Sequence, residues 1–163
     1  MTLPHPAAQS SQEGVAIPRP PSSSLGSISG ADVGQVWSLD VSGLDPKRLA
    51  GAEGVRALQG LFDALIDALD LHPIAAPIWH LFGGEHAGVT GIVALSESHL
   101  ACHSFPEHGG MTLDLYTCTS RPAPDWERLF GEHLGAGGPV RLQSRVFRRF
   151  LEPSLDHNPG ISP

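Results

Sequence analysis

The sequence predicts an α+β fold, a two-layer αβ sandwich with a mainly antiparallel sheet and helices on one face. Several short runs rich in β-branched and aromatic residues are separated by turns that contain Gly or Pro, which is typical of strands joined by hairpins. Two longer stretches instead repeat their apolar residues with helical spacing. Short connections favour antiparallel neighbours, and amphipathic helices need one apolar sheet face to cover.

Six runs have the length and composition of strands. The first ends at the turn-prone pair Ser42-Gly43, and the pair Gly83-Gly84 marks the turn between the second and the third. A break at residues 96–98 and a turn at residues 106–110 separate the next three runs. The expected strands are residues 36–41, 76–82, 88–95, 99–105, 111–118 and 140–147.

The run 111–118 alternates between apolar and polar side chains, as a strand does when only one sheet face is buried. One face carries Met111, Leu113 and Leu115. The other face is polar enough to hold chemistry, and it carries Thr112, Asp114, Tyr116 and Cys118. We expect the helices to cover the leucine face. Cys102, in the preceding strand, is expected in the core.

Two segments are expected to be helical. From Val55 to Leu69 the apolar residues recur with one buried stripe, and acidic or polar residues occupy the other positions. The second helix, residues 125–134, follows Pro122 and Pro124 and is closed by the glycines of residues 135–138.

Composition divides the chain into three parts. Residues 1–32 are rich in Pro and Ser and poor in large apolar residues, so we expect a disordered extension. Residues 33–152 form one domain, and residues 153–163 form a flexible tail. No apolar stretch is long enough to cross a bilayer, and there is no pattern of a signal peptide. Two cysteines are too few for a disulfide framework, so a reducing cytoplasm is expected.

The net charge of -7 argues against a nucleic acid or a membrane surface as partner, because both reward clustered positive charge. It is compatible with a small cationic substrate. One basic cluster interrupts the acidic balance, and it is either a solvated or dimer-facing surface or an anion site. It consists of Arg141, Arg145, Arg148 and Arg149.

A dense motif occupies residues 88–118. It joins a Gly88-Val89-Thr90-Gly91 strand, a Glu97-Ser98-His99 break, a histidine at 103, the turn Phe105-Pro106-Glu107-His108-Gly109 and the ending Tyr116-Thr117-Cys118. In this combination and spacing the segment resembles the prokaryotic S-adenosylmethionine decarboxylase proenzymes. A weaker resemblance extends upstream to residues 34–40 and to His80-Leu81-Phe82, so that it covers residues 34–120.

The chemistry of the motif follows from its residues. A serine hydroxyl held in a strained turn can attack the preceding carbonyl, here that of Glu97, and exchange the amide for an ester. Removal of the Ser98 Cα proton then expels the Glu97 carboxylate. The resulting dehydroalanine tautomerises to an imine and hydrolyses to a pyruvoyl ketone. Such a ketone forms a Schiff base with a substrate amine and accepts the electron pair left by carbon dioxide, so neither pyridoxal phosphate nor a metal is required.

The resemblance implies roles for the other motif residues. His103 is the base that assists elimination during self-processing, Thr90 stands where the family has a helping Ser hydroxyl, and Cys118 donates a proton after decarboxylation. A single continuous strand would put Ser98 and His103 on opposite faces, because they are an odd number of residues apart. We therefore expect a bend or a distortion near His99 that brings them together.

The resemblance also implies S-adenosylmethionine as the substrate, a product that donates aminopropyl groups in polyamine synthesis, and a homodimer of cleaved protomers. Glu107 would hold the ribose hydroxyls, Phe82 would stack on adenine beside Phe105, and Asp40 would come from the neighbouring chain. Departures from the family pattern lie on this substrate side. They are Leu81, an insertion around Gly83-Gly84, Gly110-Met111 and Thr119.

The sequence leaves several other hypotheses about substrate and function open. These departures leave arginine or ornithine as an alternative substrate of the same pyruvoyl chemistry. A second class is an unprocessed homologue that binds a partner without catalysis. Apart from the resemblance, Phe82 also suits core packing, and Glu107 also suits an exposed turn. A third hypothesis is a zinc or iron site, although the spacings of its candidate ligands fit no standard closed site; they are His80, His86, His99, His103 and His108.

Overall fold

The structure, a computed structural model, describes residues 34–149. The segments expected to be disordered or flexible, residues 1–32 and 153–163, lie outside these residues, as do the outermost positions of the expected 33–152 domain. Within residues 34–149, no helix combines the length and the hydropathy that crossing a membrane requires.

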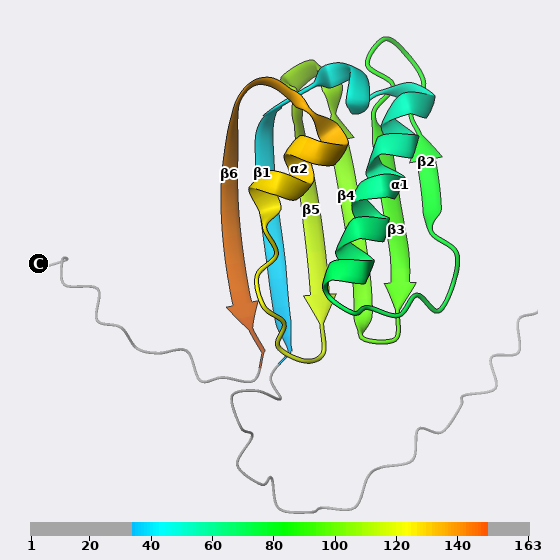
Figure 1. Ribbon diagram of the computed structural model, residues 1–163. Helices are drawn as coiled ribbons and strands as arrows, with labels where there is room; N and C mark the ends of the chain where they lie inside the picture. Colours follow the sequence, from blue (N-terminus) through cyan, green and yellow to red (C-terminus); the bar gives the residue numbers. More distant parts are fainter. Residues whose placement is uncertain (1–33, 150–163) are drawn as a thin grey trace, which may run out of the picture.

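Six strands form one antiparallel sheet in the order β2-β3-β4-β5-β1-β6 (Figure 1). Both crossovers in the chain contain a helix: α1 connects β1 to β2, and α2 connects β5 to β6. The middle of the sheet is built from hairpins. The strands are β1 (Gln35–Leu44), β2 (Ile78–Leu81), β3 (Val89–Leu95), β4 (Ser98–Phe105), β5 (Gly110–Thr117) and β6 (Ala136–Arg148).

Helices α1 (Gly51–Ala68) and α2 (Trp126–Leu134) lie on the same face of the sheet (Figure 1). The periodic apolar positions of α1 are buried, among them Leu58, Leu61 and Phe62. Helix α2 begins after Asp125, whose carboxylate accepts the N–H of Arg128 at 3.1 Å. Two short 3₁₀ turns complete the chain, η1 (Pro46–Arg48) and η2 (Pro106–His108). The α+β two-layer sandwich predicted from the sequence is thus confirmed.

The core lies between the sheet and the two helices. Leu113 and Leu115 of β5 and Leu100 of β4 are fully buried against Phe62 and other helix residues, as the alternation of residues 111–118 predicts. Cys102 belongs to this core, as predicted. Gly91 serves the packing on this face, because a methyl group at position 91 would overlap the indole ring of Trp79.

Several element boundaries differ from those predicted. Strand β2 is shorter than residues 76–82, because Pro77 has no N–H for a sheet hydrogen bond. Strand β6 begins at Ala136, inside the glycine-rich segment that was expected only to end a helix. Ser98 is the first residue of β4 rather than part of a break.

The second face of the sheet is not covered by any element within residues 34–149, and we call it the open face. It carries the side chains that alternate with the core residues. One row of cross-strand neighbours on this face runs through all six strands: His80, Thr90, His103, Thr112, Asp40 and Gln143. Of the predicted site residues, Thr90, His103 and Asp40 lie in this row, and Phe105 lies two residues beyond His103 on β4.

Candidate active site

The Glu97–Ser98 bond lies in the tight hairpin between β3 and β4. Leu95 pairs with Ser98, so only Ser96 and Glu97 connect the two strands. Two-residue hairpins normally need positive φ at their central residues, yet neither of these two adopts it. Ser98 adopts it instead, with a φ of 153°. A non-glycine residue in this region carries strain of roughly 1–3 kcal/mol.

The carbonyl oxygen of Glu97 is held by the chain that follows β5. The backbone N–H of Cys118 donates to this oxygen at 2.9 Å. Cys118 follows the end of β5, which pairs with the start of β4 through Ser98 and Thr117. A donor at this position polarises the carbonyl carbon next to Ser98 and stabilises negative charge on the oxygen during attack.

The side chain of Glu97 is anchored from a third direction by His72, in the loop between α1 and β2. One carboxylate oxygen lies 2.6 Å from His72 Nδ1, and the other accepts the His72 backbone N–H at 3.1 Å. The carbonyl of His72 in turn accepts the N–H of Ser96 at 2.8 Å. These contacts hold the hairpin turn to the 72–73 loop. The Glu97 side chain is only 11% exposed as a result.

This contact changes the pKa of both partners. Burial by itself raises the pKa of the Glu97 carboxyl, but the hydrogen bonds from the His72 ring and backbone outweigh it and lower the pKa from 4.5 to about 2. The pKa of His72 is raised, first by its hydrogen bond to Glu97 and then by the Glu97 charge, with Asp70 adding to the effect and Arg121 opposing it.

The pH range of the charged pair follows from these directions. A lowered carboxyl pKa contributes stability above its ordinary value, and this is lost as the pH falls from about 4.5 towards 2. A raised imidazole pKa contributes stability below 6.5, which is lost as the pH rises through the folded-state pKa. The pair therefore contributes its full stability to the fold between about pH 4.5 and 6.5. Because the His72 side chain is 62% exposed, solvent screens much of its effect.

A further imidazole lies beside the Ser98 hydroxyl. His99 Nδ1 is 3.2 Å from Ser98 Oγ. The His99 ring stands edge-on to Tyr116 of β5, with 5.9 Å between the ring centroids, and the Arg149 guanidinium lies 5.1 Å from the centroid of the Tyr116 ring. Each reacting group of the Glu97–Ser98 bond thus has a partner in the same chain.

Thr90 and His103 form a second group on the open face. Thr90 Oγ1 lies 2.8 Å from His103 Nδ1, across the β3–β4 pair. The two residues are thus brought together as the motif implies. They do not contact Ser98, because His103 is five residues further along the unbroken strand β4, about 16 Å at roughly 3.3 Å per residue.

The expectation that a bend near His99 brings Ser98 and His103 together within one chain is therefore wrong. Strand β4 pairs continuously with β5 from Ser98 to Phe105, and this ladder keeps the chain extended. The distortion is confined to Ser98, and it brings the hydroxyl to His99 instead.

Three predicted substrate residues meet at the far end of the open face from Ser98. Phe82, Phe105 and Glu107 line a groove with a volume of about 240 Å³, and its other lining residues are Gly83, His86, Ala87, Gly88 and Ser104. Phe82 is 51% exposed, which excludes the alternative of core packing. The N–H of Phe82 donates to the Gly88 carbonyl at 2.9 Å and closes the loop that contains the insertion.

Asp40 lies two strands away from His103, in the same cross-strand row. At a strand spacing of about 4.8 Å the two backbones are roughly 10 Å apart. Asp40 borders a separate shallow hollow with Arg141 and Gln143, so one member of the basic cluster flanks this end of the open face.

The two cysteines differ in their environment. Cys102 is buried, and burial raises the pKa of its thiol to about 12, which makes it unreactive. Cys118 lies just after β5 rather than within it, and it is exposed. Its position beside the Glu97 carbonyl places the predicted proton donor next to the predicted cleavage bond.

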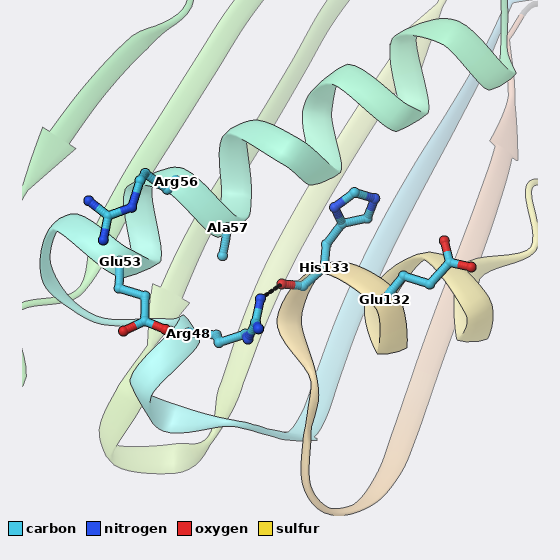
Figure 2. A pocket seen from close by; sticks show the side chains of 6 residues that line it. All are labelled: Arg48, Glu53, Arg56, Ala57, Glu132 and His133. Carbon is cyan, nitrogen blue, oxygen red and sulfur yellow. Dashed lines mark hydrogen bonds between the residues drawn. The ribbon is translucent and has the colours of Figure 1, made fainter.

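A larger hollow of about 480 Å³ lies on the opposite layer, between α1 and α2 (Figure 2). Charged side chains line it, including Arg48, Glu53 and Glu132, and Arg48 donates to the His133 carbonyl at 3.2 Å. It contains none of the motif residues. Within residues 34–149, no three His, Cys, Asp or Glu side chains lie close enough together to share a metal ion.

Two residues of this site were not found by sequence reasoning. The sequence gives His99 no role in processing, only a place in the motif and among the candidate metal ligands, although its position directly after the serine is a usable signal. His72 has no such signal, because it reaches Glu97 from 25 residues away through the fold.

The fold and the site together define a two-layer αβ sandwich with a serine-centred site in a strained hairpin. The model of the S-adenosylmethionine decarboxylase family matches residues 35–145, and the chain belongs to this family, as the motif predicts.

Individual relatives agree with this assignment. S-adenosylmethionine decarboxylase proenzyme 2 of Halalkalibacterium halodurans is 36% identical over 94 residues, which cover 57% of this chain and 65% of that protein. The proenzyme of Bacillus cytotoxicus is 58% identical over 47 residues, covering 29% of this chain and 35% of that protein. The chain thus spans less than two thirds of the length of these relatives.

A solved structure supports the fold. The crystal structure of the adenosylmethionine decarboxylase from Aquifex aeolicus superposes with a TM-score of 0.55 at 23% identity, covering 77% of this chain and 98% of that chain. At this identity the likeness establishes the fold alone.

The His72 contact predicts a measurable pKa change. In a Ser98→Ala background, which keeps the chain uncut, His72→Ala should raise the pKa of Glu97 from about 2 towards 4.5, because the ring hydrogen bond and charge are lost. The carboxyl shift of labelled glutamate in an NMR titration measures this. His108→Ala is the matched control and should leave Glu97 unchanged. A Glu97 pKa that stays near 2 in His72→Ala would contradict the prediction.

Proposed function

We propose that this protein cleaves itself between Glu97 and Ser98 and then decarboxylates S-adenosylmethionine, yielding the aminopropyl donor for polyamine synthesis. The observation that carries the proposal is the strained Ser98 beside a Glu97 carbonyl that accepts the Cys118 N–H. Membership of the S-adenosylmethionine decarboxylase family supports it, and the names of the relatives describe proenzymes.

Self-processing uses the residues of the chain itself. Attack of Ser98 Oγ on the Glu97 carbonyl carbon forms an ester and breaks the C–N bond, which relieves the strain at Ser98. Removal of the Ser98 Cα proton then breaks the Cβ–Oγ bond and releases the Glu97 carboxylate. The remaining enamine tautomerises, takes up water and loses ammonia, which leaves a pyruvoyl group on residue 98.

The pyruvoyl group supplies the electron sink for decarboxylation, and the surrounding residues do the rest. Cys118 lies beside residue 98 and is the proton donor to the product. The chain fits this group, since residue 98 is half-buried at the start of β4 and the exposed Cys118 contacts the neighbouring Glu97 carbonyl. Glu107 holds the ribose hydroxyls by charge-assisted hydrogen bonds, with Phe82 and Phe105 against the base.

The geometry further supports a homodimer in which each site is shared. His103, Thr90 and the groove of Phe82, Phe105 and Glu107 lie towards one end of the sheet, and the Glu97–Ser98 bond with Cys118 lies at the other end. If two copies stack their open faces about a two-fold axis with the strands reversed, the partner subunit's His103 lies opposite Ser98. The same operation places the partner's groove beside residue 98 and produces two identical sites.

The composition of the open face fits this packing. It exposes several large apolar side chains that a monomer would normally bury: Ile78, Phe82, Ile92, Phe105 and Phe147. Two sheets that stack face to face bury such residues at a separation of about 10 Å. Asp40, on the same face, then lies close to the partner's part of the site.

Cleavage itself is the first test. On incubation the wild-type chain should split into two fragments at Glu97–Ser98, and the second should lack a free amine and be lighter by one ammonia than a fragment that begins with serine. Ser98→Ala should remain whole, because it has no nucleophile, and Ser144→Ala on the exposed edge strand should cleave normally. Intact mass and a denaturing gel measure the result. A wild-type chain that stays intact after prolonged incubation would overturn the proposed function.

Sharing of the site predicts complementation between two inactive variants. His103→Ala alone should not cleave, since it lacks the base for elimination, and Ser98→Ala alone cannot. When the two are refolded together, the His103→Ala chain should be cut, because the Ser98→Ala partner supplies an intact His103. The double variant Ser98→Ala/His103→Ala is the control and should not support cleavage. If the His103→Ala chain stays whole in the mixture, His103 does not act across a dimer.

Glu107 distinguishes the nucleoside substrate from a basic amino acid. Glu107→Gln should reduce carbon dioxide release from S-adenosylmethionine about tenfold or more, because it removes a charged acceptor from the ribose hydroxyls. Release from arginine or ornithine, measured in parallel, should be low in both proteins. Glu85→Gln in the neighbouring loop is the matched control. Wild-type activity confined to an amino acid would show that the assigned substrate is wrong.

A further inference from the structure

The first step of the proposed processing needs a base that neither His103 nor Thr90 supplies within the chain. Ser98 must lose its hydroxyl proton as it attacks the Glu97 carbonyl. His103 lies about 16 Å away along β4 and its Nδ1 is occupied by Thr90. In the shared site, His103 is required for the Cα proton in the later elimination step.

His99 is the imidazole that contacts the reacting hydroxyl. Its Nδ1 lies 3.2 Å from Ser98 Oγ, at the outer edge of the range over which a general base acts. Consecutive residues of a strand normally point to opposite faces, so their side chains rarely meet. The positive φ of Ser98 breaks this alternation and turns the hydroxyl towards the next residue. The same distortion therefore strains the bond and brings its nucleophile to a base.

The His99 ring is held in place by its neighbours on the open face. It stands edge-on to Tyr116, its cross-strand partner in β5, at an interplanar angle of 74°. The guanidinium of Arg149 covers the Tyr116 ring. The imidazole remains exposed, so it exchanges protons readily with solvent.

All other contacts of the first step come from the same chain. The Cys118 N–H holds the carbonyl oxygen on which negative charge develops, and His72 fixes the side chain of Glu97. The arrangement is complete without a second copy. The first step thus uses a histidine of the same chain, and the elimination step uses a different histidine, which the partner subunit supplies.

We propose that His99 is the catalytic base of the first processing step, the shift of the Glu97 acyl group from the Ser98 nitrogen to its hydroxyl oxygen. This inference rests on the proposed self-cleavage. Nδ1 of neutral His99 takes the hydroxyl proton as Oγ bonds to the Glu97 carbonyl carbon. The C–N bond then breaks, and the imidazolium returns the proton to the departing nitrogen. The products are an ester, a free Ser98 amine and neutral His99, with no net change in protons.

The test isolates this step in a His103→Ala background, where the ester is not eliminated and accumulates. Neutral hydroxylamine cleaves esters but not amides, so it splits only chains that have completed the shift. Intact mass locates the new end as a hydroxamate on Glu97. We compare His103→Ala alone with the double variants that add His99→Ala or His99→Asn. Asn places a hydrogen-bonding atom near the Nδ1 position but is not a base.

Both double variants should form the ester on the order of 100-fold more slowly than His103→Ala, the usual size of a general-base contribution. Added imidazole should partly restore the rate in His99→Ala/His103→Ala, which also shows that this variant is folded. His133→Asn/His103→Ala is the matched control, because His133 lies between the helices on the other layer, and it should form ester at the parent rate.

Other outcomes separate the two proposals. If His99→Asn restores the parent rate, the contact only positions the hydroxyl and the role of His99 as a base is wrong. If both double variants react like the parent, His99 has no part in the step, although self-cleavage stands as long as the wild type cleaves. If the wild type does not cleave and the parent yields no ester, the proposed function itself fails.

Discussion

The tight connection between β3 and β4 is the constraint on which the candidate site depends. Two residues must reverse the chain, and neither is a glycine or adopts the positive φ that such hairpins favour. The positive φ is found instead at Ser98, the first residue of the next strand. It persists because the surrounding structure holds both sides: β4 pairs with β3 and β5, and the turn is tied to the 72–73 loop. The tight turn thus concentrates backbone strain next to the Glu97–Ser98 bond, where the Ser98 hydroxyl contacts His99.

The contacts around this bond come from three separate segments of the fold. The loop after α1 brings His72 to the Glu97 carboxylate, the residue after β5 brings its N–H to the Glu97 carbonyl, and His99 follows the serine directly. Each contact is modest by itself, and the groups are partly exposed to solvent. Together they hold the Ser98 hydroxyl and the Glu97 carbonyl in one geometry, which the proposed attack of the hydroxyl on the carbonyl requires.

The opposite end of the open face has a different character. It carries the Thr90–His103 pair and an exposed groove lined by aromatic residues and Glu107. Three of the expected departures from the family pattern lie at this end: Leu81 is exposed next to Phe82, Gly83 lines the groove, and Gly110 sits where a Cβ would come within 3.0 Å of the Val41 carbonyl. Thr119 instead follows Cys118 at the hairpin end. Substitutions at this end change the surface of the groove and leave the contacts around the Glu97–Ser98 bond in place.

The sequence by itself determined the sandwich, because its elements are specified by local periodicity: the alternation of residues 111–118 and the apolar stripe of α1 both survive in the fold. It also determined the family, through a motif of fixed spacing, and the same motif predicted which residues would bear the chemistry. Only the tertiary structure decided which of these residues meet. The unbroken β4 ladder separates His103 from Ser98, and the loop at residue 72 reaches Glu97. Spacing along a chain cannot reveal such contacts, because they depend on where strands pair and loops return.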